Sequence, residues 1–394
     1  MMMFPQIPML NYDVVVIGGG PAGMAAARKA GELGLEVLLL NENPVLGENL
    51  RQCDEKLASE LAEGIKGSSV DFLTSARVIE IRNYSDMEKA VVFTSPEGTK
   101  LVWVKAIIYA AGTRERHAFE AGIIGDRGAG VYTIGEAREL ISYGALPGRK
   151  VVVSGSNDSA LALAVKLAEK GAEVAAVVEE AEYALGSKDY LSRLSELGAR
   201  IYTGSKVSEV RGLRRVERVR VVKPDGEVWL DADTLIVGVE PVPTVKKLVK
   251  LGAEIDPATR GPVVNELLET TIPGIFVAGS ALMTIYDPRI AMDQGELAAC
   301  GANEFVENGG IRSALWIPVE AGENVLAVIP QRISGERDAR IYLRVSKPVK
   351  EAGLRIPEIG KKTGPATIVP SEVVKTTLRK EEIGGVIRIT VEVV

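Results

Sequence analysis

The sequence contains very little cysteine and histidine. Its 394 residues include two cysteines, Cys53 and Cys300, and one histidine, His117. Two thiols cannot supply a disulfide framework, a four-cysteine zinc site or a thiolate-ligated iron–sulfur cluster. A single imidazole argues against a histidine-rich metal site and against a hydrolase of the Ser-His-Asp type. We therefore expect no metal site in this chain.

Long apolar runs and an excess of positive charge are also missing. Residues 1–10 are apolar, but they are short, lack a positive start and are interrupted by prolines, so they do not resemble a signal peptide. No run approaches the roughly 18 apolar residues of a membrane span. The 47 basic and 53 acidic residues give a net charge of −6, which disfavours nucleic acid and polybasic membrane attachment. We expect a soluble, cytoplasmic protein with no nucleic-acid partner and no membrane span.

Two segments of the chain resemble each other. One runs from Tyr12 to Asn41 and the other from Lys150 to Glu179. Each contains a short apolar run, a turn of small residues, an amphipathic helix and another apolar run, which is the pattern of a βαβ unit. The turns begin at Gly18 and Gly155, far enough apart for two separate domains. The predicted fold is α/β with two Rossmann-like dinucleotide-binding domains.

Further strands are expected around these units. Alternating residues at 77–81, 90–94 and 101–104 predict a β-meander packed on the first sheet, and a matching meander follows the second unit, with Pro224-Asp-Gly226 as its turn. The later predicted elements are strands over 106–112, 234–238 and 275–279, a helix over 295–306 and, from about Trp316, a separate small β domain.

The first turn has the spacing of a dinucleotide site. Gly18 permits the tight turn, Gly20 lets the backbone approach a pyrophosphate, and Gly23 lets helix and strand pack closely. A turn with a purely structural role is the alternative. The position that usually carries a ribose-binding acid is Asn41, with Glu42 next to it. Because neighbouring strand residues face opposite ways, Glu42 can substitute only if the strand has already ended.

The second turn departs further from the pattern. Asn157 replaces the middle glycine, where its side chain would crowd a pyrophosphate, and Ala160 replaces the third glycine. Glu179 ends the following strand, where a carboxylate would bind a ribose hydroxyl and repel a 2′-phosphate. The second turn therefore predicts either a site for NAD rather than NADP, or a retained fold with a vestigial pocket.

Several motifs in order carry a family resemblance. The chain resembles the glutathione and thioredoxin reductase superfamily, the pyridine nucleotide-disulfide oxidoreductases with two dinucleotide-binding domains. It is similar, more closely, to the FAD- and NAD-dependent branch that accompanies anaerobic glycerol-3-phosphate dehydrogenase. The supporting motifs are both units, Ala110-Ala111-Gly112, Gly238-Val-Glu-Pro241, Pro273-Gly-Ile-Phe-Val-Ala-Gly279, Leu50-Arg-Gln-Cys53, Gly112-Thr-Arg-Glu-Arg116, residues 125–133, Gly261-Pro-Val-Val264 and Gly295-Glu-Leu-Ala298.

The resemblance implies how the chain is divided and which residues hold its cofactors, FAD and NAD. The FAD-binding domain would comprise residues 10–115 and 244–315, the NAD-binding domain 116–243, and the small β domain 316–394. The residues assigned to cofactor binding are Gly18, Gly20, Pro21, Ala22, Gly23, Asn41, Glu42, Gly47, Val78, Ala111, Gly112, Thr113, Gly155, Asn157, Asp158, Ala160, Glu179, Gly238, Gly279, Ser280 and Gly295. Ser280 stands where the superfamily usually has an acidic residue. Together with Asn41, it predicts weakened retention of FAD during purification.

No residue stands out as catalytic. Cys53 has no nearby partner for disulfide exchange, although a single thiol beside the flavin could cycle through a sulfenic acid. The alternatives for Cys53 are a small buried residue and a neighbour of the flavin without chemistry. The segment with Arg114, Arg116 and His117 is expected to be a solvated or interdomain surface, with anion binding by either arginine as the alternative.

Three functions are compatible with these residues. The first is an FAD-dependent oxidoreductase that passes a hydride between NAD(H) and flavin, as a subunit of a larger dehydrogenase. Its electrons would leave to a partner subunit or a small acceptor, because the chain carries no second redox centre. The alternatives are a non-catalytic nucleotide-binding or structural subunit, and a peroxide or disulfide reductase that uses Cys53.

Overall fold

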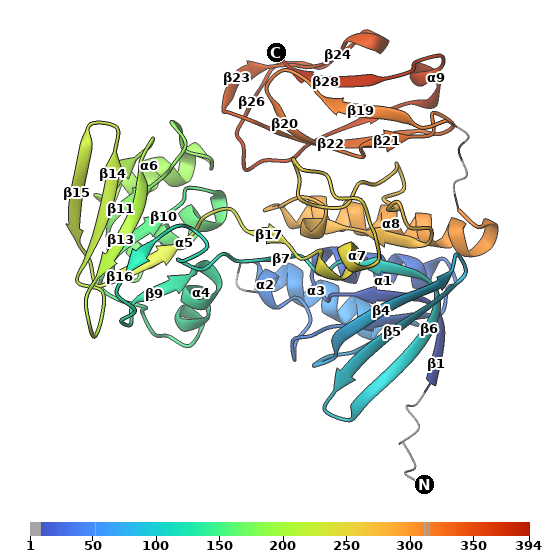
Figure 1. Ribbon diagram of the computed structural model, residues 1–394, viewed down its shortest axis with the longest axis horizontal. Coiled ribbons are helices and arrows are strands. Elements are labelled where there is room, and N and C mark those ends of the chain that lie inside the picture. The colour runs from blue at the N-terminus through green and yellow to red at the C-terminus, as the bar shows by residue number, and fades with distance from the viewer. Residues whose placement is uncertain (1–8, 52, 311–312, 314) are drawn as a thin grey trace.

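The computed structural model describes residues 9–51, 53–310, 313 and 315–394. Figure 1 shows three parts: a blue and orange part around the first unit, a green part around the second, and a red part formed by the C-terminal strands. Among the described residues, no helix has the length and apolar character needed to cross a membrane. Within the same ranges, no group of His, Cys, Asp or Glu side chains is placed to hold a metal ion. The prediction about a signal peptide falls largely on residues 1–8, which lie outside the described residues.

The first sheet positions the first glycine turn. Its strand order is β3-β2-β1-β6-β5-β4, and β18 also pairs with β6. Val14 to Ile17 pair in parallel with β2 on one side and with β6 on the other, and they are buried. The strands of this sheet are β1 (Met9–Ile17), β2 (Val37–Leu40), β3 (Asp71–Leu73), β4 (Arg77–Ser85), β5 (Glu88–Ser95), β6 (Gly98–Tyr109) and β18 (Ile275–Val277).

Strand β6 joins the meander to the parallel sheet. Residues 98–104 pair antiparallel with β5, residues 101–104 and 106–109 pair in parallel with β1, and residues 107–109 also pair in parallel with β18. The prediction of separate strands at 101–104 and 106–112 is therefore wrong, because a single strand runs from Gly98 to Tyr109. The meander extends the first sheet instead of packing on it.

Small residues let two helices cross closely over this sheet. A Cβ on Gly295 would lie 2.1 Å from the carbonyl oxygen of Ala22, so α1 and α8 need a glycine at their crossing. The predicted helix over 295–306 begins earlier, at Pro288, where Asp287 caps it by accepting from the Arg289 amide. The helices of this part are α1 (Pro21–Glu32), α2 (Glu48–Arg51), α3 (Glu55–Lys66), α7 (Lys246–Lys250), α8 (Pro288–Asn308) and the 3₁₀ helix η1 (Gly279–Ala281).

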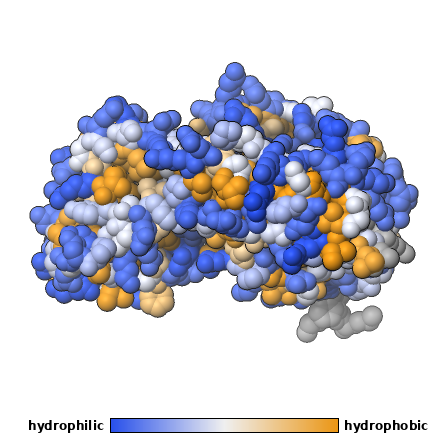
Figure 2. All heavy atoms as spheres, turned by 90° about the horizontal axis from the view of Figure 1, so that it is seen from above, coloured by the Kyte–Doolittle hydropathy of each residue, from blue (hydrophilic) through white to orange (hydrophobic). Residues whose placement is uncertain are grey.

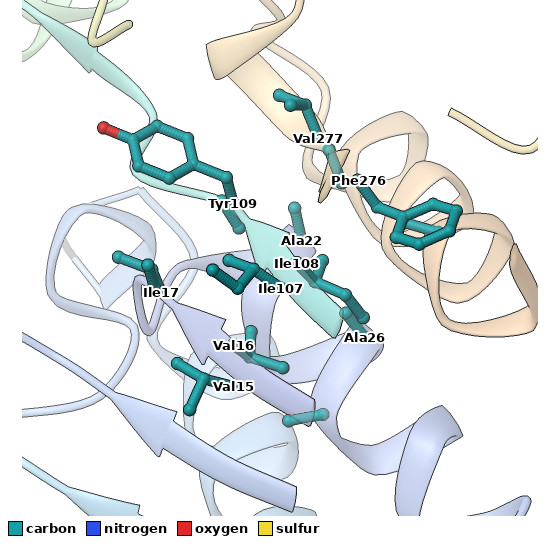
Figure 3. Packing of buried hydrophobic residues seen from close by; sticks show 14 of the residues in the cluster. Val15, Val16, Ile17, Ala22, Ala26, Ile107, Ile108, Tyr109, Phe276 and Val277 are labelled. Atoms are coloured by element: carbon teal, nitrogen blue, oxygen red, sulfur yellow. The ribbon is translucent and has the colours of Figure 1, made fainter. Parts of the chain in front are cut away.

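The core beneath the first turn comes from five elements, β1, β6, β18, α1 and α8. Figure 3 shows side chains of the neighbouring strands β1, β6 and β18 together with Ala22 and Ala26 of α1, and the Phe276 ring of β18 packs on Phe305 of α8. Because both faces of the parallel strands are covered, their sequences are continuous apolar runs rather than alternating ones. The labelled residues are Val15, Val16, Ile17, Ala22, Ala26, Ile107, Ile108, Tyr109, Phe276 and Val277.

The second unit forms its own parallel sheet, in the order β12-β11-β10-β16-β9. A four-stranded sheet in the order β15-β14-β13-β8 covers one face, and its β14–β15 turn lies at the predicted Pro224-Asp-Gly226. The strands of this part are β8 (Ile124–Gly125), β9 (Val131–Thr133), β10 (Lys150–Ser154), β11 (Glu173–Val178), β12 (Arg200–Tyr202), β13 (Lys206–Arg211), β14 (Arg218–Lys223), β15 (Gly226–Asp231) and β16 (Thr234–Val237), and its helices are α4 (Ile134–Ser142), α5 (Asp158–Glu169) and α6 (Lys188–Glu196). The predicted α/β fold with two Rossmann-like sheets is confirmed.

Two short strands connect the second unit to the rest. Strands β7 (Thr113–Arg114) and β17 (Val242–Pro243) pair antiparallel, one on the way into the unit and one on the way out. The C-terminal strands then form three small sheets around a separate apolar core. Their elements are β19 (Ile317–Ala321), β20 (Val325–Ile329), β21 (Arg332–Ile333), β22 (Ala339–Val345), β23 (Val349–Ala352), β24 (Leu354–Ile356), η2 (Pro357–Ile359), β25 (Lys361–Lys362), β26 (Ala366–Ile368), β27 (Val374–Leu378), α9 (Lys380–Ile383) and β28 (Ile389–Val393).

Candidate nucleotide-binding site

A cavity of about 960 Å³ extends from the first glycine turn to the second unit. The space-filling view in Figure 2 shows two lobes that meet at a narrower waist. The first unit contributes the ends of β1, β2 and β6 and the start of α1 to the cavity wall, and the second unit contributes the starts of α4 and α5. Ligands of doubly wound folds bind at such carboxyl ends of parallel strands.

The first turn fits a pyrophosphate. Gly18 has a φ of +109°, and a Cβ there would lie 2.3 Å from the Ala110 carbonyl oxygen. Above Gly20 the space is open, since an added Cβ would meet nothing within 4 Å. Gly20 is also the N-cap of α1, and no side chain caps this helix. Its first amides are therefore available to an anion such as the FAD pyrophosphate.

Asn41 holds the turn together from within. Its Oδ1 accepts from the Gly19 amide at 3.0 Å, and its Nδ2 donates to the carbonyls of Asn43 and Val45 at 2.9 and 3.0 Å. Both amide hydrogens are thus used inside the protein, so a ribose could reach only the remaining lone pair of Oδ1.

Glu42 is the carboxylate that the cavity wall offers near this turn. Strand β2 ends at Leu40, which fulfils the condition under which Glu42 can replace the usual acid. The Glu42 carboxylate lies 3.2 Å from Nε of Arg77, and both side chains are exposed. Lys247, from α7, lines the same region, and burial together with the Arg77 charge lowers its pKa despite the attraction of Glu42. No sequence pattern marks Lys247, because its placement depends on the chain returning to the first sheet.

Six further residues that the resemblance assigns to cofactor binding also line the cavity. Ala111, Gly112, Thr113 and Val78 belong to the wall, together with Gly279 and Ser280. The Ser280 hydroxyl donates to the Ile285 carbonyl and accepts from the Ile285 amide, both at 3.2 Å, so it closes a loop before α8.

The polar groups of the wall include two neutral phenols. Burial raises the pKa of Tyr109 to about 12, and burial next to the Glu240 carboxylate raises the pKa of Tyr286. Both side chains therefore stay neutral at ordinary pH, and Tyr286 donates to Glu240 at 2.8 Å.

Three residues assigned to cofactor binding, all glycines, pack around the first turn but do not line the cavity. A Cβ on Gly23 would lie 1.8 Å from the Gly18 carbonyl oxygen, and Gly295 lies against Ala22 at the helix crossing. Gly47 has a φ of +70° and donates its amide to the Gly19 carbonyl. These glycines allow close packing around the turn. Pro21 and Ala22, by contrast, belong to the wall.

In the second turn, Asn157 acts as a helix cap. Its φ is −67°, so it does not adopt the left-handed conformation that a glycine would permit. Its Oδ1 accepts from the Ala160 amide at 3.0 Å, and its Nδ2 donates to the Gly238 carbonyl at 2.7 Å. The Asn157 side chain therefore occupies an amide of the first turn of α5 that a pyrophosphate could otherwise use.

Glu179 is buried in hydrogen bonds of its own chain. It accepts from the amide and hydroxyl of Ser156 at 2.9 and 2.6 Å and from the Ala181 amide at 3.0 Å. The following segment lies over the turn, since Leu185 donates to the Ser156 hydroxyl and Gly186 to its carbonyl. Of the predicted residues of the second unit, the wall includes Asn157 but not Gly155, Asp158, Ala160, Glu179 or Gly238.

The part of the second unit that does face the cavity is its flavin-directed end. Ile134, Val237 and Val239 supply apolar surface, and Ser159 supplies a hydroxyl. Arg138 donates to the carbonyl and hydroxyl of Ser159 at 3.0 and 2.8 Å, which holds its guanidinium at the wall. This end fits the nicotinamide half of a pyridine nucleotide, which needs an apolar surface to stack against.

Cys53 and Cys300 are both free thiols. Cys53 is exposed and belongs to the cavity wall, whereas Cys300 is exposed on α8. The interpretation of Cys53 as a small buried residue is therefore wrong. Gln52, part of the Leu50–Cys53 motif, lies outside the described residues.

The charged segment after Gly112 is largely engaged with itself. Arg114 lies 2.9 Å from the Glu120 carboxylate, Arg116 donates to the Glu120 carbonyl, and His117 is exposed. Glu115, which no sequence pattern singles out, accepts from the Gly135 amide at 2.8 Å and so ties this segment to the start of α4.

Known proteins are similar to this chain in sequence and in fold. A sequence model of the family described as pyridine nucleotide-disulphide oxidoreductases matches residues 12–297. The chain is 26% identical to a ferredoxin–NADP reductase of Sulfurisphaera tokodaii, over 76% of this chain and 95% of that protein. It is 27% identical to an opine oxidase subunit of Agrobacterium tumefaciens, over 74% of this chain and 65% of that protein. A thioredoxin reductase structure from T. acidophilum has a TM-score of 0.64 at 20% identity, over 75% of this chain and 98% of that chain, and shows the same fold.

Proposed function

The chain belongs to the pyridine nucleotide-disulphide oxidoreductase family, and on that premise we propose that it passes a hydride between NAD(H) and bound flavin as one subunit of a larger dehydrogenase. Membership confirms the predicted superfamily, the oxidoreductase class and the cofactors FAD and a pyridine nucleotide. The closer likeness to the branch that accompanies glycerol-3-phosphate dehydrogenase stays a prediction, as does the cytoplasmic location. The domain boundaries 10–115, 116–243, 244–315 and 316–394 and the assigned cofactor residues are likewise part of the proposal.

The observation that carries the proposal is the continuity of the cavity. It joins the open space over Gly20 to the apolar end of the second unit at Val237 and Val239. Hydride transfer needs donor and acceptor in contact, with water excluded, and needs no acid or base from the protein. When bound, the flavin supplies a hydride acceptor that can also release electrons to another centre.

The residues of the chain would bind and orient the two ligands. The uncapped start of α1 would hold the FAD pyrophosphate, and Glu42 would accept a hydrogen bond from the adenosine ribose. Val237, Val239 and Ile134 would exclude water where the nicotinamide stacks. Tyr109 and Tyr286 remain neutral phenols and place no charge there.

Two observations support a role as a subunit: the names of two relatives, and the small number of cysteines in the chain. Two relatives are named as subunits of larger enzymes, an opine oxidase and a sarcosine oxidase, and the chain spans 65% and 36% of their lengths. With only two cysteines, both free and far apart in the sequence, the chain offers no obvious route for electrons beyond the flavin. The electrons would therefore leave to a partner subunit or a small acceptor.

The test is anaerobic mixing of FAD-loaded protein with NADH or NADPH, followed by flavin absorbance. We expect about one flavin per chain, bleached by NADH and not by NADPH. Flavin that stays oxidised with both nucleotides would overturn the proposal and favour a non-catalytic subunit, for which the engaged side chains of Asn157 and Glu179 argue. Equal reduction by NADPH would refute the predicted preference for NAD.

A pair of variants locates the nucleotide end of the cavity. Ser159→Trp places a large ring in the wall, whereas Ser192→Trp places the same ring on the exposed face of α6. The first should slow reduction by NADH while leaving reduction by dithionite unchanged, and the second should change neither. If both variants match the unmodified protein with NADH, the nucleotide does not enter beside Ser159.

A further inference from the structure

The C-terminal strands lie outside the part of the chain matched by the family model, which ends at residue 297. They nevertheless contact both nucleotide-binding parts of the chain. In Figure 1 the red strands lie above α8, and polar contacts join them to the green second unit as well. The contacts with the second unit fall at two places. One is at the second glycine turn, and the other is at the connection that returns from the second unit to the first.

The first place is the segment that covers the second turn. Ser371 donates its hydroxyl to the Asp158 carboxylate at 2.8 Å and its amide to the Leu185 carbonyl at 3.1 Å. The hydroxyl of Tyr183, in the same covering segment, donates to the Ser346 carbonyl. The other Asp158 oxygen accepts from the Ser187 amide at 2.7 Å, so one carboxylate links the turn, its cover and the C-terminal strands.

The second place is an ion pair at the return connection, formed by a buried arginine and a half-buried carboxylate. Arg344 of β22 is only 6% exposed, and its guanidinium donates to Glu240 at 2.6 Å and to the Pro370 carbonyl at 2.7 Å. Glu240 lies between β16 and β17, and its second oxygen accepts from Tyr286 in the cavity wall. Because Arg344 is buried, loss of Glu240 would leave a desolvated guanidinium, and the hydrogen-bonded pair therefore favours one geometry of its two partners.

The other polar ties between the second unit and the rest of the described chain lie along its two connections. Covalently the second unit is joined through β7 and β17, which pair over two residues each. Connections of a few residues at element ends are where domains hinge. The Glu115–Gly135 hydrogen bond adds a tie near the entry connection. The exit connection is tied to the first part of the chain by Tyr286–Glu240 and Thr244–Gly112, and to the C-terminal strands by Arg344–Glu240.

We propose that the C-terminal β domain is a clamp that fixes the second unit over the cavity, with Arg344 as a positioning residue that acts through Glu240 and Tyr286. The hydrogen bond from Ser371 to Asp158 is the second contact of this clamp. The clamp itself follows from the contacts of the chain, while its effect on hydride transfer rests on the proposed function. The C-terminal domain thereby sets how closely the nucleotide end of the second unit approaches the flavin.

The test compares Arg344→Met with Arg355→Met by backbone hydrogen exchange in the FAD-loaded protein. Arg355 pairs with Glu392 at 2.7 Å inside the same β domain, so its loss is a matched control. Amides of the exit connection, such as that of Thr244, and of the covering segment, such as those of Leu185 and Gly186, should exchange on the order of tenfold faster in Arg344→Met than in Arg355→Met. Equal exchange in the two variants would overturn the clamp.

Two further variants guard against loss of folding. Arg344→Met/Glu240→Gln removes both charges together, and Ser371→Ala removes only the contact with Asp158. Each should loosen the amides near its own contact, and unchanged exchange in both would refute the proposal. The clamp also predicts slower flavin reduction by NADH, with unchanged reduction by dithionite, in the double variant. If NADH fails to reduce even the unmodified protein, the proposed function fails while the exchange result still decides the clamp.

Discussion

Replacing Gly20 by alanine separates cofactor binding from folding. Gly20 has a φ of −77° and a ψ of −176°, which alanine adopts freely, and an added Cβ would meet no protein atom within 4 Å. The methyl group would instead enter the space where the pyrophosphate approaches the start of α1. Inserting a methyl group into a filled contact typically costs about 1–3 kcal/mol, which corresponds to roughly 5- to 150-fold weaker FAD binding.

The assay is a titration of flavin-free protein with FAD, followed by quenching of FAD fluorescence. Thermal unfolding of the flavin-free protein should change little for Gly20→Ala, as for the matched control Gly384→Ala, where an added Cβ also meets nothing within 4 Å. Gly23→Ala should behave in the opposite way and destabilise the flavin-free protein, since its Cβ would lie 1.8 Å from the Gly18 carbonyl oxygen. Unchanged FAD affinity in Gly20→Ala would refute the placement of the pyrophosphate over this turn.

Three further predictions concern single side chains. In the same fluorescence titration, Glu42→Gln should weaken FAD binding by roughly tenfold, because one charge-assisted hydrogen bond is lost. An unchanged affinity would show that Glu42 does not bind FAD. Burial lowers the pKa of Lys89 to about 8, so the folded state loses this proton before the unfolded state does, and the free energy of unfolding should rise between pH 8 and 10.5 by at most about 3 kcal/mol. Denaturant unfolding should show a flatter pH dependence for Lys89→Met over this range, and parallel curves would contradict the reasoning. Cys53→Ser should leave peroxide-dependent oxidation of NADH unchanged. Loss of this activity in the variant would instead support the single-cysteine reductase.

The sequence predicted the parts of the fold that depend on local patterns. Both βαβ units and the glycine turns follow from apolar runs and small residues whose spacing has a direct steric cause. The assignment of Ala111 to Thr113 to cofactor binding came from the family resemblance instead. The single strand β6 was missed because a half-exposed meander strand and a buried parallel strand have different periods, and β6 passes from one environment to the other without a turn.

Contacts between distant segments could not be predicted in this way. The pairing of Glu240 with Arg344 joins residues 104 positions apart, and nothing in either local pattern marks the partner. Asn157 illustrates a different limit. From the sequence, the replacement of glycine by Asn157 predicts that a pyrophosphate would be crowded. Only the structure shows that the Asn157 side chain caps α5 and donates to the Gly238 carbonyl.

The two turns are consequently unequal as anion sites. In the first unit Asn41 supports the turn from behind and leaves the start of α1 uncapped, so its amides remain free for a ligand. In the second unit Asn157 already satisfies an amide of the first turn of α5, and the segment around Leu185 lies over the turn. A ligand at the second turn must displace or share these hydrogen bonds, whereas a ligand at the first meets unsatisfied donors. We therefore expect FAD to bind more tightly than NADH, by tenfold or more if the pyridine nucleotide forfeits one such hydrogen bond. This difference suits a cofactor that stays bound and a substrate that exchanges. Separate titrations of FAD into flavin-free protein and of NAD⁺ into FAD-loaded protein measure the two affinities, and an equal or tighter pyridine nucleotide would contradict this account of the two asparagines.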